Sequence, residues 1–468
     1  MPEEFRRREE DKDLIKRFEE HLSQRSHYFF DEDTFELIIQ HYLDIEKNAK
    51  ALKACEIALA QYPLSMELLL LKAQVLSNMN EWDKAIEVLE TANTVYPNDS
   101  EILALTGTIF NMMGRYDEAV EVLSKSLEST DEPEEIYYQI GMAYQSNAKY
   151  REAIEAYKKA LEQNLHHDGA LYEMAFCLDV LDELEQSVDY YQKFIDEDPY
   201  SSYAWYNLGI VFNKLEKFDL AIDAYDYAIL IDEEFASAWF NLANAYMNQE
   251  EFVKALEAYK KTLDLEGPSA EVFCCIGAAY EKMSQLELGL KYYQKAVKMD
   301  ELYDDAWFGM GSCLLQQEKF FEAIHFLSKA IALNPENFEF WTAKAEAEYK
   351  TGNIVSAMEA YEEAIALEPT SIECWLDLSY IPFEQGDFDK AISLMEEALE
   401  EIPDAPAFHY RMTAYLIGNG KYQEAFHFLE NALILDFDMH TVLFEFFPNL
   451  EIQKVLFKII DQYKKDNH

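Results

Sequence analysis

The chain has 468 residues, half of them hydrophobic, with 90 acidic against 39 basic side chains and a net charge of −51. So negative a chain repels nucleic-acid phosphates and anionic membranes, which excludes nucleic-acid binding. No apolar run approaches the roughly 18 residues that span a bilayer, so we expect no membrane insertion. The six cysteines form no CxxC pair, which favours a cytoplasmic location and predicts no metal site.

Residues 1–31 form the first segment, and they are charged throughout the stretch EEFRRREEDKDLIKRFEEHL. The extreme N-terminus has no apolar core of the kind that a secretory signal needs. We predict a charged helix here that caps the structure following it.

An internal repeat fills residues 32–439. Its clearest mark is a tryptophan at steps that are multiples of 34 residues, at Trp205, Trp239, Trp307, Trp341 and Trp375. If this aromatic is placed at position 4, twelve units follow without an insertion, beginning at residues 32, 66, 100, 134, 168, 202, 236, 270, 304, 338, 372 and 406. A fixed period of this size indicates a repeat array.

Each unit reads as two amphipathic helices. Positions 4, 8 and 11 share one helix face, as Trp205, Gly209 and Phe212 show, and positions 20, 24 and 27 share another. Small residues at positions 8 and 20 allow two helices to approach closely. Since one helix pair cannot bury its apolar faces alone, the pairs must stack into a solenoid.

These columns resemble those of the tetratricopeptide repeat family, whose pattern is W-x₂-L-G-x₂-Y, then A-x₃-F, then P. Unit six shows the match in Trp205, Leu208, Gly209, Phe212, Ala221, Tyr225 and Ala228. The resemblance implies an all-α, right-handed superhelical solenoid of antiparallel helix pairs. It also implies a concave groove lined by the first helix of each unit, and binding of proteins or peptides without catalysis or cofactors.

Two features depart from the regular array. Pro382 falls inside the first helix of unit eleven, where it predicts a kink or break. Residues 440–468 begin like another unit and end in an amphipathic helix, which predicts a partial repeat with a C-terminal capping helix. The alternative for this end is that Phe444, Phe446 and Phe447 dock a partner or a second copy.

The candidate binding residues come from positions 2, 5, 6, 9, 12 and 13, which the resemblance places on the groove. Position 2 is acidic in eight units, which the helix dipole explains without a ligand. Units five to seven instead carry Gly169, Tyr203 and Ser237 there. Aromatic and amide side chains gather in units four to seven, and the candidates are Tyr138, Gln139, Met142, Tyr172, Phe176, Tyr203, Tyr206, Asn207, Asn213, Phe240, Asn241, Asn244 and Asn248.

Amides can pair with the main chain of an extended peptide, and aromatic rings give apolar contact at low entropic cost. The alternative is that these side chains only pack between units. We predict a non-enzymatic protein-interaction scaffold that binds a peptide or partner protein, including partners with basic segments. The other hypothesis is a self-assembling module that forms homo-oligomers through its ends or aromatic edges.

Overall fold

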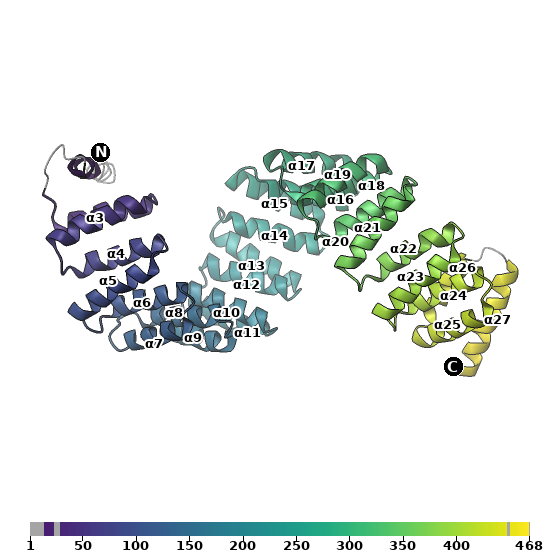
Figure 1. Cartoon of the computed structure of the whole chain (residues 1–468), viewed down its shortest axis with the longest axis horizontal. Coiled ribbons are helices and arrows are strands. Elements are labelled where there is room, and N and C mark those ends of the chain that lie inside the picture. The colour runs from purple at the N-terminus through teal and green to yellow at the C-terminus, as the bar shows by residue number, and fades with distance from the viewer. Residues whose placement is uncertain (1–13, 23–28, 447–449, 468) are drawn as a thin grey trace. The chain divides into compact units, whose positions relative to one another are not determined.

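The computed structural model describes residues 14–22, 29–446 and 450–467, and within them it is helical, without a strand (Figure 1). Residues 14–22 of the predicted N-terminal segment are helical, whereas its residues 1–13 and 23–28 lie outside the described part. The chain divides into two compact units, Met1–Ala238 and Trp239–His468.

The helices of the first compact unit alternate as first and second members of a pair. They are α2 (Glu32–Asp44), α3 (Asn48–Gln61), α4 (Met66–Asn78), α5 (Trp82–Val95), α6 (Ser100–Met112), α7 (Tyr116–Ser126), α8 (Pro133–Ser146), α9 (Tyr150–Gln163), α10 (Asp168–Val180), α11 (Glu185–Glu197), α12 (Ser202–Lys214) and α13 (Phe218–Ile231). The division into compact units falls in α14 (Ala236–Asn248).

The same alternation continues in the second compact unit. Its further helices are α15 (Phe252–Glu266), α16 (Ala270–Lys282), α17 (Leu286–Met299), α18 (Asp304–Gln316), α19 (Phe320–Leu333), α20 (Phe338–Lys350), α21 (Ile354–Leu367), α22 (Ile372–Glu384), α23 (Phe388–Glu401), α24 (Pro406–Gly418), α25 (Tyr422–Leu435), η1 (Asp438–Val442), α26 (Leu443–Phe446) and α27 (Leu450–Asn467). The first helices begin at, or one residue before, the repeat starts read from the sequence.

The turn inside each pair has the same backbone conformation. Position 15 adopts a left-handed φ in every pair, whether it is a glycine, as Gly352 (φ 82°), or not, as Glu216 (φ 57°). Glycine reaches this region without steric cost, whereas glutamate does not. The packing of the two helices therefore imposes this turn even where the local residue does not favour it.

Close approach of the paired helices depends on position 8. A Cβ atom added to Gly209 would lie 2.5 Å from Cε1 of Tyr225, the core tyrosine of the facing helix. Position 4 holds the turn between pairs, since the indole N–H of Trp205 donates to the carbonyl oxygen of Pro199 at 3.1 Å, and Trp341 does the same to Pro335 at 2.8 Å. The role predicted for Trp205 is thus structural.

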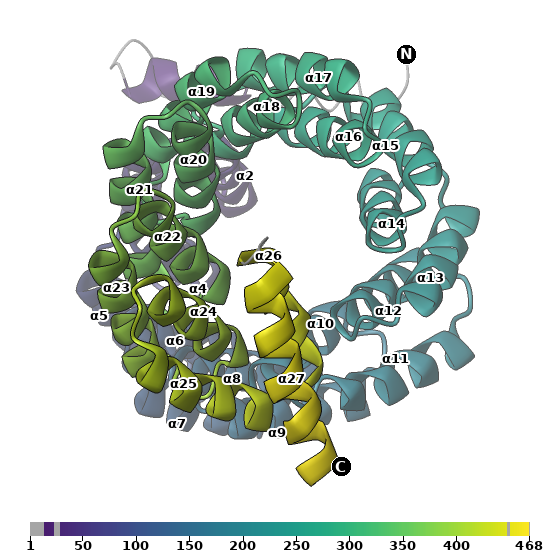
Figure 2. The same cartoon turned by 90° about the vertical axis from the view of Figure 1, so that its right-hand side faces the viewer.

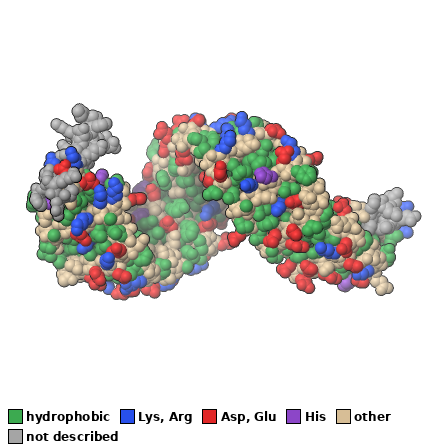
Figure 3. All heavy atoms as spheres, turned by 45° about the horizontal axis from the view of Figure 1, so that its top comes forward, with side chains coloured by type: hydrophobic (Ala, Val, Ile, Leu, Met, Phe, Trp, Pro, Cys, Tyr) green, Lys and Arg blue, Asp and Glu red, His purple; other side chains and the backbone are tan. Residues whose placement is uncertain are grey.

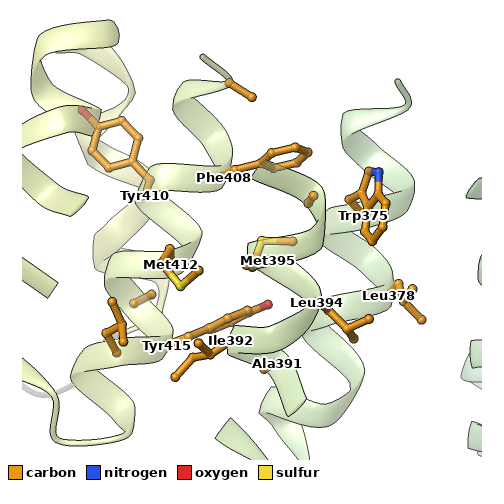
Figure 4. Close-up of a cluster of buried hydrophobic side chains, with 14 of the residues drawn as sticks. Trp375, Leu378, Ala391, Ile392, Leu394, Met395, Phe408, Tyr410, Met412 and Tyr415 are labelled. Atoms are coloured by element: carbon orange, nitrogen blue, oxygen red, sulfur yellow. The ribbon is translucent and has the colours of Figure 1, made fainter. Parts of the chain in front are cut away.

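The buried side chains form clusters between successive helices. The cluster of α22 to α24 includes Trp375, Leu378, Met395, Phe408 and Tyr415 (Figure 4). Each pair therefore completes its core with the next one, as a repeat array requires.

The break predicted at Pro382 is wrong. Helix α22 is continuous over Ile372–Glu384, with Pro382 inside it. The proline removes one backbone bond near the end of the helix, where few bonds depend on it. Its carbonyl oxygen still accepts from Asp387 N at 2.9 Å, and the ring of Phe383 stacks on Tyr415 at 4.7 Å. Packing on the following pair holds the last turn in place.

The C-terminal residues close the last cluster. Leu456 and Ile460 of α27 are 3% and 4% exposed. Phe444 and Phe446, named above as residues that could dock a partner, pack against this cluster, and the ring of Phe446 lies 5.6 Å from that of Phe383. The third residue of that set, Phe447, lies outside the described residues.

First helices and second helices form opposite faces of each compact unit. Successive first helices contact one another, as α2 does α4, α10 does α12 and α16 does α18. In Figure 2, the first helices α10 and α12 lie on one side of the first compact unit and the second helix α11 lies on the other. In the second compact unit, α16, α18 and α20 lie on one side and α17, α19 and α21 lie on the other. The first-helix face, defined by α2, α4, α6, α8, α10 and α12 in the first compact unit, carries the candidate binding positions.

Candidate functional site

The predicted site residues lie on first helices. In the first compact unit they belong to α8, α10 and α12, and in the second compact unit Phe240, Asn241, Asn244 and Asn248 belong to α14. The sequence placed them on one type of helix, but their exposure and contacts differ.

Aromatic side chains of α10 and α12 are open to solvent. Tyr172, Phe176 and Tyr203 are 53%, 43% and 55% exposed, although large apolar side chains are usually buried. The ring of Tyr206 lies 4.8 Å from that of Phe235, and Phe235 lies 5.4 Å from Tyr203. We call these five residues the aromatic surface. Phe235 was missed because it falls in the turn between units, outside the positions considered.

Tyr138 of α8 lies beside an ion pair. Its ring is 4.8 Å from that of His167, whose Nε2 lies 3.4 Å from Oε2 of Glu135. The hydrogen bond to Glu135 raises the pKa of His167, and the same bond lowers the pKa of Glu135. Burial raises the pKa of Tyr138. This candidate is thus half-buried against its neighbours.

Several candidate amides are engaged inside the protein. Asn207 is 7% exposed, and Asn244 accepts a 2.6 Å hydrogen bond from the hydroxyl of Tyr259. Gln139 donates to Glu135 at 3.2 Å and accepts from Thr108 of the preceding pair at 3.5 Å. Met142 packs against the buried cluster of α9 to α12. The bond from Thr108 joins two units, which suits the packing alternative that the sequence left open, whereas the bonds of Asn244 to Tyr259 and of Gln139 to Glu135 lie within one unit.

The remaining candidates differ in exposure. Asn213, Phe240 and Asn241 are partly buried, and Asn248 is exposed. The ring of Phe240 lies 5.8 Å from that of Tyr259. Their role in binding remains a prediction.

On the face that Figure 3 shows, acidic side chains are more widespread than basic ones, as expected from 90 acidic against 39 basic residues. Beside the aromatic surface, Lys214 pairs with Asp179, and Lys217 pairs with Glu185 at 2.6 Å. These two cations of α12 and its following turn are therefore already neutralised by carboxylates of the preceding pair.

A hollow elsewhere on the first-helix face was not predicted. It is a pocket of about 700 Å³ that crosses α2, α4 and α6. Its lining comprises Asp33, Glu36, Leu37, Gln40, Glu67, Leu70, Leu71, Gln74, Glu101 and Leu105. We call it the leucine groove. Leucine at position 6 of three consecutive units, Leu37, Leu71 and Leu105, was the signal in the sequence that could have revealed it.

Three carboxylates beside this groove are crowded. Oxygen atoms of Glu32, Glu36 and Glu67 lie within 4.8 Å of one another. Burial, and then the charges of Glu67, Asp33 and Glu32, raise the pKa of Glu36. With one oxygen from each carboxylate the cluster offers three ligands, and Ca²⁺ takes six to eight, so water or second carboxylate oxygens would have to complete a metal site here.

Among the helices that the structure describes, none is long and apolar enough to cross a membrane.

Models of tetratricopeptide repeats match the chain along most of its length. The N-terminal repeat region of Psidin matches residues 38–156, and further tetratricopeptide repeat models match 138–202, 202–235, 236–267, 276–331, 314–376 and 349–414. The chain belongs to the tetratricopeptide repeat family. This membership supports protein interaction as its class of function, in a family that is typically non-enzymatic.

Solved tetratricopeptide repeat structures resemble the chain at low identity. Cut9–Hcn1, an APC/C hetero-tetramer, is 15% identical over 83% of this chain and 97% of that chain, with a TM-score of 0.41. YrrB, described as having an unusual peptide-binding site, is 23% identical over 38% and 92%, with a TM-score of 0.32. MamA is 28% identical over 37% and 94%, with a TM-score of 0.33. A search of curated proteins finds no match.

Proposed function

We propose that this tetratricopeptide repeat protein is a non-enzymatic scaffold that binds a segment of a partner protein on its first-helix face. The observation that carries the proposal is the exposure of Tyr172, Phe176 and Tyr203, at 53%, 43% and 55%. Their neighbours on the same helices, such as Leu171 and Leu208, are buried at 2% exposure. The exposed rings therefore contribute little of their surface to the core, and a partner can contact them.

The chemistry of the aromatic surface suits a peptide. Tyrosine and phenylalanine offer large, rigid contact areas at low conformational cost, and tyrosine adds a hydroxyl that can bond a peptide main chain. The acidic surroundings favour partners with basic segments by long-range attraction. Binding of this kind needs no catalytic group and no cofactor.

The test uses peptides selected from a displayed random library on the full-length chain. Tyr172→Ala with Tyr203→Ala removes two exposed rings. We expect this double variant to bind the selected synthetic peptides with an affinity lower by more than about tenfold. Leu230→Ala is the matched control, because Leu230 is 79% exposed but lies on the second helix α13. Equal affinity for the wild type and the double variant, with unchanged circular dichroism, would refute the proposal.

Self-assembly remains a second candidate, supported by one observation at the C-terminal end. An apolar pocket of about 260 Å³ opens between α24, α25 and α27, and Tyr422, Phe426 and Val455 on its lining are 60%, 49% and 55% exposed. Light scattering over a range of concentrations tests it. A mass that rises with concentration, and returns to that of a monomer in Phe426→Asp, would support self-assembly through this end.

A further inference from the structure

The leucine groove presents three chemically distinct rows across three parallel helices. Position 6 gives the row Leu37, Leu71 and Leu105, and position 2 gives the acidic row Asp33, Glu67 and Glu101. Gln40 and Gln74 at position 9 begin a third, amide row on the other side. Since positions 2 and 6 are four residues apart, the acidic and apolar rows run side by side, about 6 Å apart.

The apolar row is only partly covered by the protein itself. Leu37 is 58% exposed, although the neighbouring Phe35, Ile38 and Ile39 of the same helix are fully buried. Leu70, Leu71 and Leu105 are partly buried and complete an apolar floor between the helices. Covering such a row with an apolar partner removes its surface from water, which is favourable.

One acid beside the acidic row, Glu36, is not explained by the helix dipole. An acid in the first turn complements the helix dipole, which accounts for Asp33, Glu67 and Glu101. Glu36 lies beyond the first turn of α2, and the dipole effect fades there. Its carboxylate is crowded by Glu32 and Glu67 within 4.8 Å, an arrangement that a bound cationic group would relieve.

We infer that the leucine groove binds a basic amphipathic helix of a partner protein. This inference rests on the proposed function, which it deepens by naming a partner class for the N-terminal part of the first-helix face. Lysine or arginine side chains of the partner would face Asp33, Glu36 and Glu67, and its apolar stripe would cover Leu37, Leu71 and Leu105.

The spacing of the rows selects a helix over an extended segment. Neighbouring packed helices lie about 8–10 Å apart, so the leucine row repeats at about that step. Seven residues of an α-helix rise about 10.5 Å, so apolar residues at i and i+7 match successive leucines. A helix also displays an apolar and a basic stripe next to each other along its length. An extended segment instead alternates its side chains between opposite faces.

The experiment measures fluorescence anisotropy of a labelled helical peptide of about 18 residues, long enough to cross three helices. The peptide has leucines on one stripe and lysines on the next, and a scrambled peptide of identical composition is its control. We expect the full-length chain to bind the patterned peptide, and to bind it more weakly as salt rises from about 50 to about 500 mM. Equal binding of the scrambled peptide would overturn the inference, because it would reveal mere attraction to a negative protein.

Three variants locate the binding. Glu36→Gln with Glu67→Gln should lower the affinity for the patterned peptide roughly fivefold. Leu37→Ser should lower the same affinity about tenfold. The matched control Glu87→Gln with Glu90→Gln on the second helix α5 removes the same charge and should leave the affinity unchanged. An equal loss in this control, or no loss in Leu37→Ser, would contradict the inference.

Two further readouts separate competing occupants and hypotheses. If Leu37→Ser lowered the mass of the free chain in light scattering, the groove would belong to a second copy and the inference would fail. If library-selected peptides bind the aromatic surface while the patterned peptide does not bind, this inference alone is wrong. If neither type of peptide binds, the proposed function fails with it.

Discussion

The leucine groove and the aromatic surface use the same repeat positions with opposite chemistry. At position 2 the groove has Asp33 and Glu67, whereas the aromatic surface has Tyr203. At position 6 the groove has a leucine row, and α10 and α12 carry Glu173 and Asn207 instead. The same repeat positions therefore carry different side chains in the two regions, and the first-helix face differs in its chemistry from one region to the other.

The first prediction compares the helices that carry the two surfaces. A Cβ at Gly209 would lie 2.5 Å from the ring of Tyr225, and a Cβ at Gly107 would lie 2.5 Å from Cγ of Leu123. A rigid ring cannot yield as a leucine can by changing rotamer. We expect Gly209→Ala to lower the free energy of unfolding by about 1–3 kcal/mol.

For Gly107→Ala we expect a smaller loss, since the better helix propensity of alanine offsets the clash by up to about 1 kcal/mol. Urea unfolding measures both variants. If both variants lowered the free energy of unfolding equally, the facing side chains Tyr225 and Leu123 would accommodate the added methyl group equally well. The two regions would then not differ in their packing.

The second prediction concerns the charge crowding that is specific to the leucine groove. The pKa of Glu36 is raised above its ordinary value of 4.5 in the folded chain. The folded chain thus holds this proton to a higher pH than the unfolded chain does, so folding stability falls as the pH rises between the two values. Above the raised pKa, Glu36 is ionised in the folded chain, and the cost of holding this half-buried charge beside Glu67, Asp33 and Glu32 lowers folding stability in full.

Glu36→Gln removes this penalty while it weakens the patterned peptide. We expect its melting temperature at about pH 7 to exceed that of the wild type by roughly a degree, and the difference to vanish near about pH 4. Differential scanning calorimetry checks this, with Glu90→Gln as control. A lower melting temperature at neutral pH would mean that Glu36 serves the fold and not a partner.

The third and smallest prediction concerns the aromatic region. The pKa of His167 is raised from its ordinary 6.5 and that of Glu135 is lowered, each foremost through their shared hydrogen bond. The pair stabilises the fold below the ordinary pKa of His167, and this contribution is lost as the pH rises through the raised value. Glu135→Gln should therefore destabilise the chain slightly at about pH 6 and hardly at all at about pH 8.

Thermal unfolding at the two pH values measures this effect, and Glu128→Gln serves as an exposed control. If Glu135→Gln lowered the thermal stability equally at both pH values, Glu135 would act through its hydrogen bond with Gln139 and not through His167.

The repeat made much of the fold predictable from sequence. Trp205, Gly209 and Tyr225 are each one member of a column that recurs along the chain, so the pattern specified both helices and their facing sides. The structure confirmed an all-helical tetratricopeptide solenoid. The break at Pro382 was wrongly predicted, because the rule that proline ends a helix leaves out the packing of Phe383 on Tyr415, which only the next pair supplies.

The candidate site was predicted less completely. The thinning of acid at position 2 pointed to Tyr203, which is exposed, but the same reasoning also selected Asn207, which is 7% exposed. A side chain next to the core face can turn either way, and repeat position does not fix which. The leucine groove was overlooked because its acids had a sufficient explanation in the helix dipole.

The sequence by itself determined the period, the helix pairs, the core columns and the excess of negative charge, because each follows from residue type and spacing along one chain. Only the tertiary structure decided which side chains remain open. Leu37, Leu71 and Leu105 are far apart in sequence and form a row only after three helices stack. Tyr203 and Tyr206 likewise meet Phe235 only after the chain has turned back at the end of α13. Exposure depends on what neighbouring pairs cover, and that is a property of packing between units.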